Sequence, residues 1–262
     1  MIQETNKLIK YGFLTRRSWW FTATARTRAR FSRTTLGSLW IGIANLLCSL
    51  LLGGVYGAVF NVSNLKEYFI YLSLGFSIWT ILGGAINSAP TIFDLNGHNI
   101  KNSNIHPLFY VLEDWAFQIQ NFIQSFLFII IFITFLSPTV LINFLIFSPI
   151  HLLNFFLFLL WLPLLICLAA VKFQDLYQLV PIITQLIFLL SPIIYIEKNL
   201  GDYAFIAELN PLYQILSLLR NSIINGVFLI KPALLFLALN ILMIYITFYI
   251  LNKKKKEIIF YL

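Results

Sequence analysis

Charge is scarce in this chain of 262 residues: only 11% are Asp, Glu, Lys or Arg, against about 25% in an ordinary soluble domain. Hydrophobic residues make up 60% of the sequence. A soluble fold of this size has too little interior to bury so much apolar surface. The composition therefore argues against a free cytosolic enzyme or a nucleic-acid-binding module and predicts an integral membrane protein.

Cysteine is also scarce. The only two, Cys48 and Cys167, both lie inside apolar runs. They do not have the number or the setting of a disulfide framework, and we interpret them as core residues.

Sequence motifs that would indicate an enzyme or an ATPase are missing too. The sequence has no glycine-rich phosphate loop ending in Gly-Lys-Ser/Thr, no His-Glu-x-x-His and no Cys-x-x-Cys. Its three histidines are at least eight positions apart, and no acidic residue lies in the middle of a long apolar run. We therefore predict no catalytic residue, no metal site and no cofactor in this chain. The lack of an intramembrane carboxylate also argues against an ion-coupled carrier.

What the chain has instead is a series of apolar runs. A spanning helix needs about 20 mostly apolar residues. Six charge-free stretches have this length: Ser38–Phe60, Tyr68–Ala89, Trp115–Leu136, Leu152–Val171, Leu176–Tyr195 and Pro232–Leu251. With six spans, 14 of the 18 Lys and Arg residues fall on the side of the amino terminus and four on the other. The positive-inside rule then predicts that both termini are cytoplasmic.

These runs predict a single all-α, polytopic domain over residues 1–262. It consists of a cytoplasmic interfacial segment over 1–37, a six-helix membrane domain over 38–251 and a basic cytoplasmic tail over 252–262. The first segment is both basic and aromatic. Its Lys7 and Lys10 can face water while apolar neighbours face the membrane, as in an amphipathic interfacial helix. That helix either serves only as an anchor or also docks a cytoplasmic partner.

Two of the connecting segments are too long to be minimal turns. The cytoplasmic segment between the second and third runs has 18 residues, Pro90–Pro107. It is either a plain loop or a short helix that a motor domain pushes. On the outer side, Tyr203–Leu209 and Leu212–Ile224 are apolar but too short to span. We expect a pair of re-entrant helices there, with a simple loop as the alternative.

Several of these segments together resemble a known family. Arg30-Phe-Ser-Arg-Thr-Thr-Leu-Gly-Ser-Leu-Trp40 at the first run resembles a basic, aromatic Thr-x-Leu-Gly-x-x-Trp signature. The ordered matches that follow are Asn99-Ile-Lys101, Asp175, Leu190-Ser-Pro-Ile-Ile-Tyr195, Leu209-Asn-Pro-Leu212 and Arg220. The family is the membrane subunit of type-2 ABC exporters of bacterial polysaccharides, which export O-antigen, capsule or teichoic acid. The run Arg26-Thr-Arg-Ala-Arg30 departs from its usual pattern by being more basic.

The resemblance implies a homodimer, joined by two copies of a separate ATPase subunit that binds ATP and Mg. The dimer would pass a lipid-linked polysaccharide through a channel in the bacterial cytoplasmic membrane, with no nucleic acid involved. It also implies residue roles. Coupling to the ATPase falls to Lys7, Lys10, Tyr11, Asp94, His98, Asn99 and Lys101, the first-span motif to Arg30, Thr35, Gly37 and Trp40, and the outer gate to Asn210, Pro211 and Arg220.

A polysaccharide channel should present aromatic rings beside hydroxyl and amide groups. The aromatic candidates are Tyr56, Tyr68, Tyr71, Trp79, Tyr177 and Tyr195. Each could instead belong to the interfacial aromatic belts of the membrane. Three other functions stay open at this point: an ABC exporter of a small lipid or drug, a membrane enzyme of glycan assembly, and a structural membrane protein without transport.

Overall fold

The computed structural model describes residues 2–103 and 105–262 of the chain. Every regular element in these residues is helical. The elements are α1 (Ile2–Leu14), α2 (Arg16–Arg30), α3 (Leu39–Val59), α4 (Leu65–Ser88), η1 (Ala89–Thr91), α5 (Ile92–Leu95), α6 (Gly97–Asn102), α7 (Leu108–Leu136), α8 (Thr139–Phe147), α9 (Pro149–Ala170), α10 (Leu176–Leu190), η2 (Glu197–Tyr203), α11 (Ala204–Leu209), α12 (Pro211–Asn225) and α13 (Ile230–Tyr261). The prediction of an all-α fold is confirmed for these residues.

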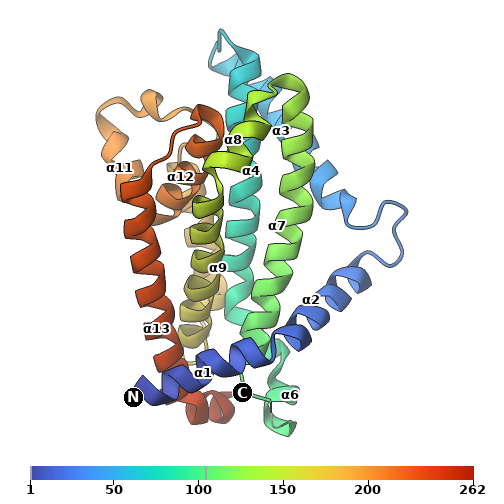
Figure 1. Cartoon of the computed structure of the whole chain (residues 1–262), viewed down its shortest axis with the longest axis vertical. Helices are drawn as coiled ribbons and strands as arrows, with labels where there is room; N and C mark the ends of the chain where they lie inside the picture. The colour runs from blue at the N-terminus through green and yellow to red at the C-terminus, as the bar shows by residue number, and fades with distance from the viewer. Residues whose placement is uncertain (1, 104) are drawn as a thin grey trace.

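Five of the helices are long and apolar enough to cross a membrane: α3, α4, α7, α9 and α13. They run along the long axis of the molecule (Figure 1). Helix α10 is also apolar, but its 15 residues rise only about 22 Å. That is less than the roughly 30 Å of a bilayer core. The chain is thus a multi-pass membrane protein, and its described residues contain five candidate crossings and one shorter apolar helix.

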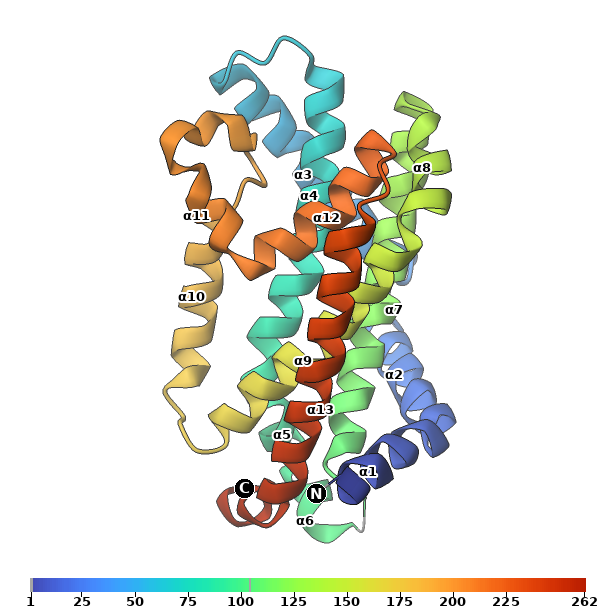
Figure 2. The same cartoon turned by 60° about the vertical axis from the view of Figure 1, so that its left-hand side comes forward.

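Both chain termini lie at the same end of the bundle, beside α1 and α6 (Figures 1 and 2). We call this the termini end. Helices α8, α11 and α12 lie toward the opposite end, which we call the far end.

Helix α4 lies at the centre of the bundle. Its side chains Leu72, Leu74, Ile78 and Leu82 are fully buried. Five helices, α3, α7, α9, α10 and α12, contact it. By contrast, α3 and α13 expose long apolar faces, which suits contact with lipid or with another chain.

A buried polar network joins α9 to α13. The Trp161 indole Nε1 donates to Asn240 Oδ1 at 2.8 Å, and the Asn240 amide donates to the carbonyl oxygen of Asn154 at 3.1 Å. Asn154 in turn donates to the carbonyl oxygen of Ala233 at 2.9 Å. Because all these groups find partners inside the bundle, the network fixes how two apolar helices pack.

The structure corrects the ends of several predicted segments. The fifth run continues to Tyr195, but its helix ends at Leu190. Ser191 adopts an extended conformation because it precedes Pro192, and a proline disfavours the helical conformation of the residue before it. Helix α13 continues from the last apolar run through the lysines of the predicted tail to Tyr261. Lysine is a good helix former, so nothing ends the helix at the edge of the apolar run.

The third and fourth runs are also corrected. Helix α7 begins at Leu108, seven residues before the charge-free run. It accommodates Glu113 and Asp114 because Arg26 of α2 pairs with both. The apolar residues before the fourth run form a separate helix, α8, and α9 begins at Pro149. Proline is favoured at the first position of a helix.

The connecting segments contain the short helices expected of them, with differences in detail. The interfacial segment is two helices, α1 and α2, that meet at Thr15. The segment between the second and third runs contains two short helices, α5 and α6, where we expected one. The two short apolar pieces after the fifth run are the helices α11 and α12, within about a residue of the expected bounds.

Candidate functional site

A buried arginine organises the far end of the chain. Arg220 of α12 is only 1% exposed. Its guanidinium carbon lies 3.7 Å from the centre of the Tyr71 ring, and its nitrogens donate to the carbonyl oxygen of Pro192 at 2.9 Å and to the Tyr213 hydroxyl at 3.1 Å. A planar guanidinium can stack and donate at the same time. Arg220 therefore joins α4, α12 and the segment that follows α10.

Two tyrosines of α4 hold that same segment. The Tyr71 hydroxyl donates to the carbonyl oxygen of Pro192 at 2.9 Å, and the Tyr68 hydroxyl donates to that of Ile194. The Tyr195 hydroxyl turns back and donates to the carbonyl oxygen of Leu190 at 2.9 Å. The backbone after α10 has left the helix, so its carbonyl oxygens have no helical hydrogen-bond donors. Tyrosine hydroxyls of α4 bind these oxygens instead and thereby hold the segment against α4.

The charge of Arg220 is connected to a carboxylate through a phenol. The Tyr213 hydroxyl accepts from Arg220 and donates to Glu197 Oε2 at 3.2 Å. Burial raises the pKa of Tyr213 well above its usual range, so the phenol keeps the proton that it donates. Sequence reasoning missed Tyr213 and Glu197. The spacing of Tyr213 and Arg220, seven residues apart and hence on one helix face, was a signal that could have found the first.

Asn210 and Pro211 define the start of α12. Asn210 Oδ1 accepts from the backbone N–H of Leu212 at 3.0 Å, and its amide donates to Ser191 Oγ at 2.9 Å. This is a side-chain cap followed by a proline at the first helical position. The structure therefore brings six predicted site residues into one cluster: Tyr68, Tyr71, Tyr195, Asn210, Pro211 and Arg220. With Tyr213 and Glu197 they form what we call the far-end cluster.

The other aromatic candidates do not join this cluster. Tyr56 stacks on Phe60 at the far end of α3. Trp79 is buried in the bundle, with its ring 5.6 Å from that of Phe188. Tyr177 lies at the other end of α10, where its hydroxyl donates to the Asp94 carboxylate of α5. The six candidates are thus spread along the whole length of the bundle.

Helix α10 carries exposed amides on an otherwise apolar surface. Gln178 and Gln185 are both exposed, and their spacing of seven residues places them on one face of the helix. Neighbouring exposed residues, such as Ile182 and Leu186, are apolar. Leaving an amide in hydrocarbon costs a few kcal/mol, so this face is poorly suited to lipid.

The residues predicted to couple to an ATPase lie on the surface of the termini end. Lys7 and Lys10 of α1 are exposed, as are Asp94 of α5 and His98, Asn99 and Lys101 of α6. Phe93 of α5 and Ile100 of α6 are buried, and they anchor the two short helices to the bundle. The exposed polar side chains of these helices can therefore contact a partner, and that of Asp94 also accepts the hydrogen bond from Tyr177.

His106 fixes α1 to the start of α7. Its ring lies 5.7 Å from that of Tyr11, and its Nδ1 accepts from the backbone N–H of Leu108 at 3.1 Å. Burial, with a smaller effect of Lys255, lowers the pKa of His106 to about 4. The imidazole is therefore neutral at physiological pH, which suits a ring that packs between two helices.

Arg26 holds α2 against α7. Its Nη1 lies 2.9 Å from Asp114 Oδ1 and 3.7 Å from Glu113 Oε1, and its guanidinium carbon lies 4.1 Å from the centre of the Phe117 ring. Asp114 is only 5% exposed, so this pair replaces the water that the carboxylate loses. Sequence reasoning noted Arg26 only as a departure from a family pattern. The signal it missed was a pair of carboxylates just before an apolar run.

The first-span motif forms the connection from α2 to α3. Gly37 has φ of 57°, a left-handed conformation that glycine adopts without strain. Arg30, Thr35 and Trp40 are exposed around this turn. Over residues 2–103 and 105–262, no group of three His, Cys, Asp or Glu side chains could hold a metal ion.

A comparison with protein families identifies the class of protein. Residues 19–224 match the model of the ABC-2 type transporter family. The match covers well over half of the chain, and the chain therefore belongs to this family of ABC transporter membrane subunits. Such a chain is a transport subunit, and the ATPase resides in a partner subunit. A search of curated proteins gave no match.

Proposed function

We propose that this chain exports a lipid-linked polysaccharide, such as O-antigen, capsular polysaccharide or teichoic acid, across the bacterial cytoplasmic membrane. Two copies form the channel, and two ATPase subunits drive it. Neither copy changes its substrate covalently. The termini end faces the cytoplasm, in keeping with the excess of Lys and Arg there.

The observation that carries this proposal is the amide-bearing face of α10. Gln178 and Gln185 are exposed on the surface of this apolar helix. In a dimer whose α10 helices line a water-filled conduit, the amides meet water and sugar hydroxyls. The conduit also gives α10 a protein environment, so a helix of 15 residues and the turn after it complete the sixth crossing.

The tyrosines of the far-end cluster favour polysaccharide over a small drug or lipid. Sugars combine apolar ring faces with many hydroxyl groups and bind best where aromatic rings lie beside polar groups. The far-end cluster offers such rings at the end of α10, where a glycan would leave the conduit.

The hydrogen bond between Asp94 and Tyr177 offers a route for the motor to act on the conduit. Asp94 belongs to α5 in the proposed coupling segment, and Tyr177 belongs to the first turn of α10. A push on α5 and α6 by the ATPase therefore reaches α10 directly. The bundle needs two arrangements of this helix, and the nucleotide state of the partner selects between them.

Chemical labelling tests the conduit. In a chain with Cys48 replaced by Ser, the variant Gln185→Cys should react with a water-soluble maleimide in the assembled transporter and cross-link between copies. Leu242→Cys, an exposed position on the apolar face of α13, is the matched control and should do neither. Equal reactivity at the two positions would refute the conduit.

An export assay tests the substrate and the coupling. Replacing residues 94–105 with a flexible linker should abolish both export and co-purification of the ATPase, with membrane insertion unchanged. Co-purification that survives the replacement would overturn the coupling assignment. A transporter that moves a fluorescent lipid or drug but no glycan would favour the smaller-substrate alternative.

A further inference from the structure

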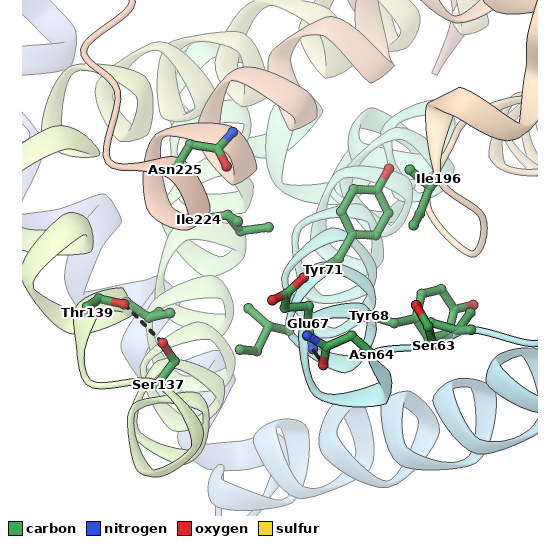
Figure 3. Close-up of a pocket in the computed structure, with 13 residues that line it drawn as sticks. Ser63, Asn64, Glu67, Tyr68, Tyr71, Ser137, Thr139, Ile196, Ile224 and Asn225 are labelled. Carbon is green, nitrogen blue, oxygen red and sulfur yellow. Dashed lines mark hydrogen bonds between the residues drawn. The ribbon is translucent and has the colours of Figure 1, made fainter.

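A pocket of about 530 Å³ lies at the far end of the chain (Figure 3). It is formed between the start of α4, the turn from α7 to α8 and the end of α12. A single chain forms it, and none of its described lining residues belongs to α10. It therefore lies away from the α10 face of the proposed conduit, beside the tyrosines Tyr68 and Tyr71 of the far-end cluster.

Polar groups line this pocket from three elements. Asn64 and Glu67 come from the start of α4, and Asn225 comes from the end of α12. In Figure 3 the hydroxyls of Ser137 and Thr139, which lie 3.0 Å apart, are on the opposite side from Asn64 and Glu67. Amide, carboxylate and hydroxyl groups that converge on one space can satisfy the many hydroxyls of a sugar.

Two tyrosines of the far-end cluster complete the lining, and their contacts hold them in place. Tyr68 and Tyr71 donate their hydroxyls to backbone carbonyls, and the guanidinium of Arg220 packs on the Tyr71 ring. Apolar side chains, among them Val140 and Ile224, lie beside them. Because these rings are already ordered, a ligand that packs against them does not have to immobilise them.

The charge of the pocket restricts the ligand. None of its described lining residues is Lys or Arg, and Glu67 supplies a carboxylate that is exposed to the pocket. A carboxylate repels phosphate and uronate groups, accepts hydrogen bonds from hydroxyls and attracts ammonium groups. This argues against the phosphate of a phospholipid headgroup and favours a neutral or amino-substituted sugar.

We infer that this pocket binds a neutral or amino-substituted sugar residue of the exported glycan as the chain emerges at the far end. The binding itself follows from the lining of the pocket alone. Its role in export rests on the proposed function, so the two are tested by separate readouts.

Binding is measured on the full chain in lipid nanodiscs by calorimetry, with three tetrasaccharide probes: maltotetraose, the glucosamine tetramer and tetragalacturonate. We expect the glucosamine tetramer to bind about tenfold more tightly than maltotetraose, because it alone brings a charged donor to the carboxylate. Tetragalacturonate should bind least. Glu67→Gln should remove the preference for the amino sugar, and Thr139→Trp, which fills the pocket, should weaken binding of all probes.

The matched control is Glu208→Gln, an exposed carboxylate on α11 that does not line the pocket. It should leave all three affinities unchanged. Binding of none of the probes, equal binding of tetragalacturonate, or an equal effect of Glu208→Gln would overturn the inference. If Thr139→Trp abolishes binding but glycan export continues at the normal rate, the role in export is wrong although the site exists. An ATPase that fails to co-purify would count against the proposed function and leave the binding result intact.

Discussion

Replacing Arg220 should release the turn that ends α10. Arg220→Met keeps much of the volume but removes the hydrogen bonds to Pro192 and Tyr213 and the stack on Tyr71. A hydrogen bond from a charged donor contributes about 1.5–3 kcal/mol, and a desolvated cation–π contact contributes about 2 kcal/mol. Removing the buried charge returns part of this, since its desolvation costs several kcal/mol. We therefore expect a net loss of about 3 kcal/mol in the free energy of unfolding.

The assay is chemical denaturation in detergent combined with hydrogen exchange. Exchange should increase in residues 191–196 and change little in α9 and α13. Arg220→Lys keeps the charge but not the planar stack, and it should lose about 1–2 kcal/mol. Arg17→Met, at an exposed position of α2, is the control and should be neutral. An unchanged midpoint together with unchanged exchange at 191–196 in Arg220→Met would refute the role of the arginine.

Three further predictions concern contacts away from this cluster. Arg26→Met leaves a buried carboxylate without its cation, and it should loosen α2 at a cost of about 1–3 kcal/mol, detected as faster proteolysis between α2 and α3. In the folded chain the pKa of His106 is lowered from 6.5 to about 4. As the pH falls, the unfolded chain therefore binds the proton first. The free energy of unfolding is thus greatest above pH 6.5 and decreases between pH 6.5 and 4. Hydrogen exchange of α1 should rise over that interval in the wild type and not in His106→Gln. Asn240→Leu removes the acceptor of Trp161 and should lower the unfolding midpoint by the equivalent of about 1–2 kcal/mol; an unchanged midpoint would mean that the network adds no stability.

The sequence predicted the helical, multi-pass fold well because long apolar runs leave a chain few alternatives in a membrane. Helix ends were predicted less well, since they depend on contacts between elements. The start of α7 illustrates this. In the sequence, Glu113 and Asp114 come directly before the charge-free run that begins at Trp115. The helix nevertheless includes them, because Arg26, more than 80 residues away, pairs with both carboxylates.

The candidate site was predicted in part. Asn210, Pro211 and Arg220 stood out because an asparagine-proline pair and a charge are conspicuous in apolar sequence, and the structure brings them together. Their partners were not predictable in the same way. Glu197 reaches Arg220 only through Tyr213, across a turn whose path no local pattern specifies.

The same limit applies to the aromatic residues. Trp79 and Tyr195 both belong to apolar runs of the sequence, but Trp79 is buried against α10 while Tyr195 closes the turn after it. Apolar periodicity shows that a residue lies in a spanning segment. It does not show whether that residue faces the core, the lipid or a partner.

The most direct test of the transport assignment is a pull-down of the intact chain from its native membrane in mild detergent. Mass spectrometry of the purified complex would look for an ATPase subunit and for bound lipid-linked sugar. We predict equal numbers of this chain and an ATPase subunit, two of each, with a lipid-linked glycan bound. A folded and dimeric preparation with neither an ATPase nor a glycan would contradict the assignment and favour a membrane protein that acts alone.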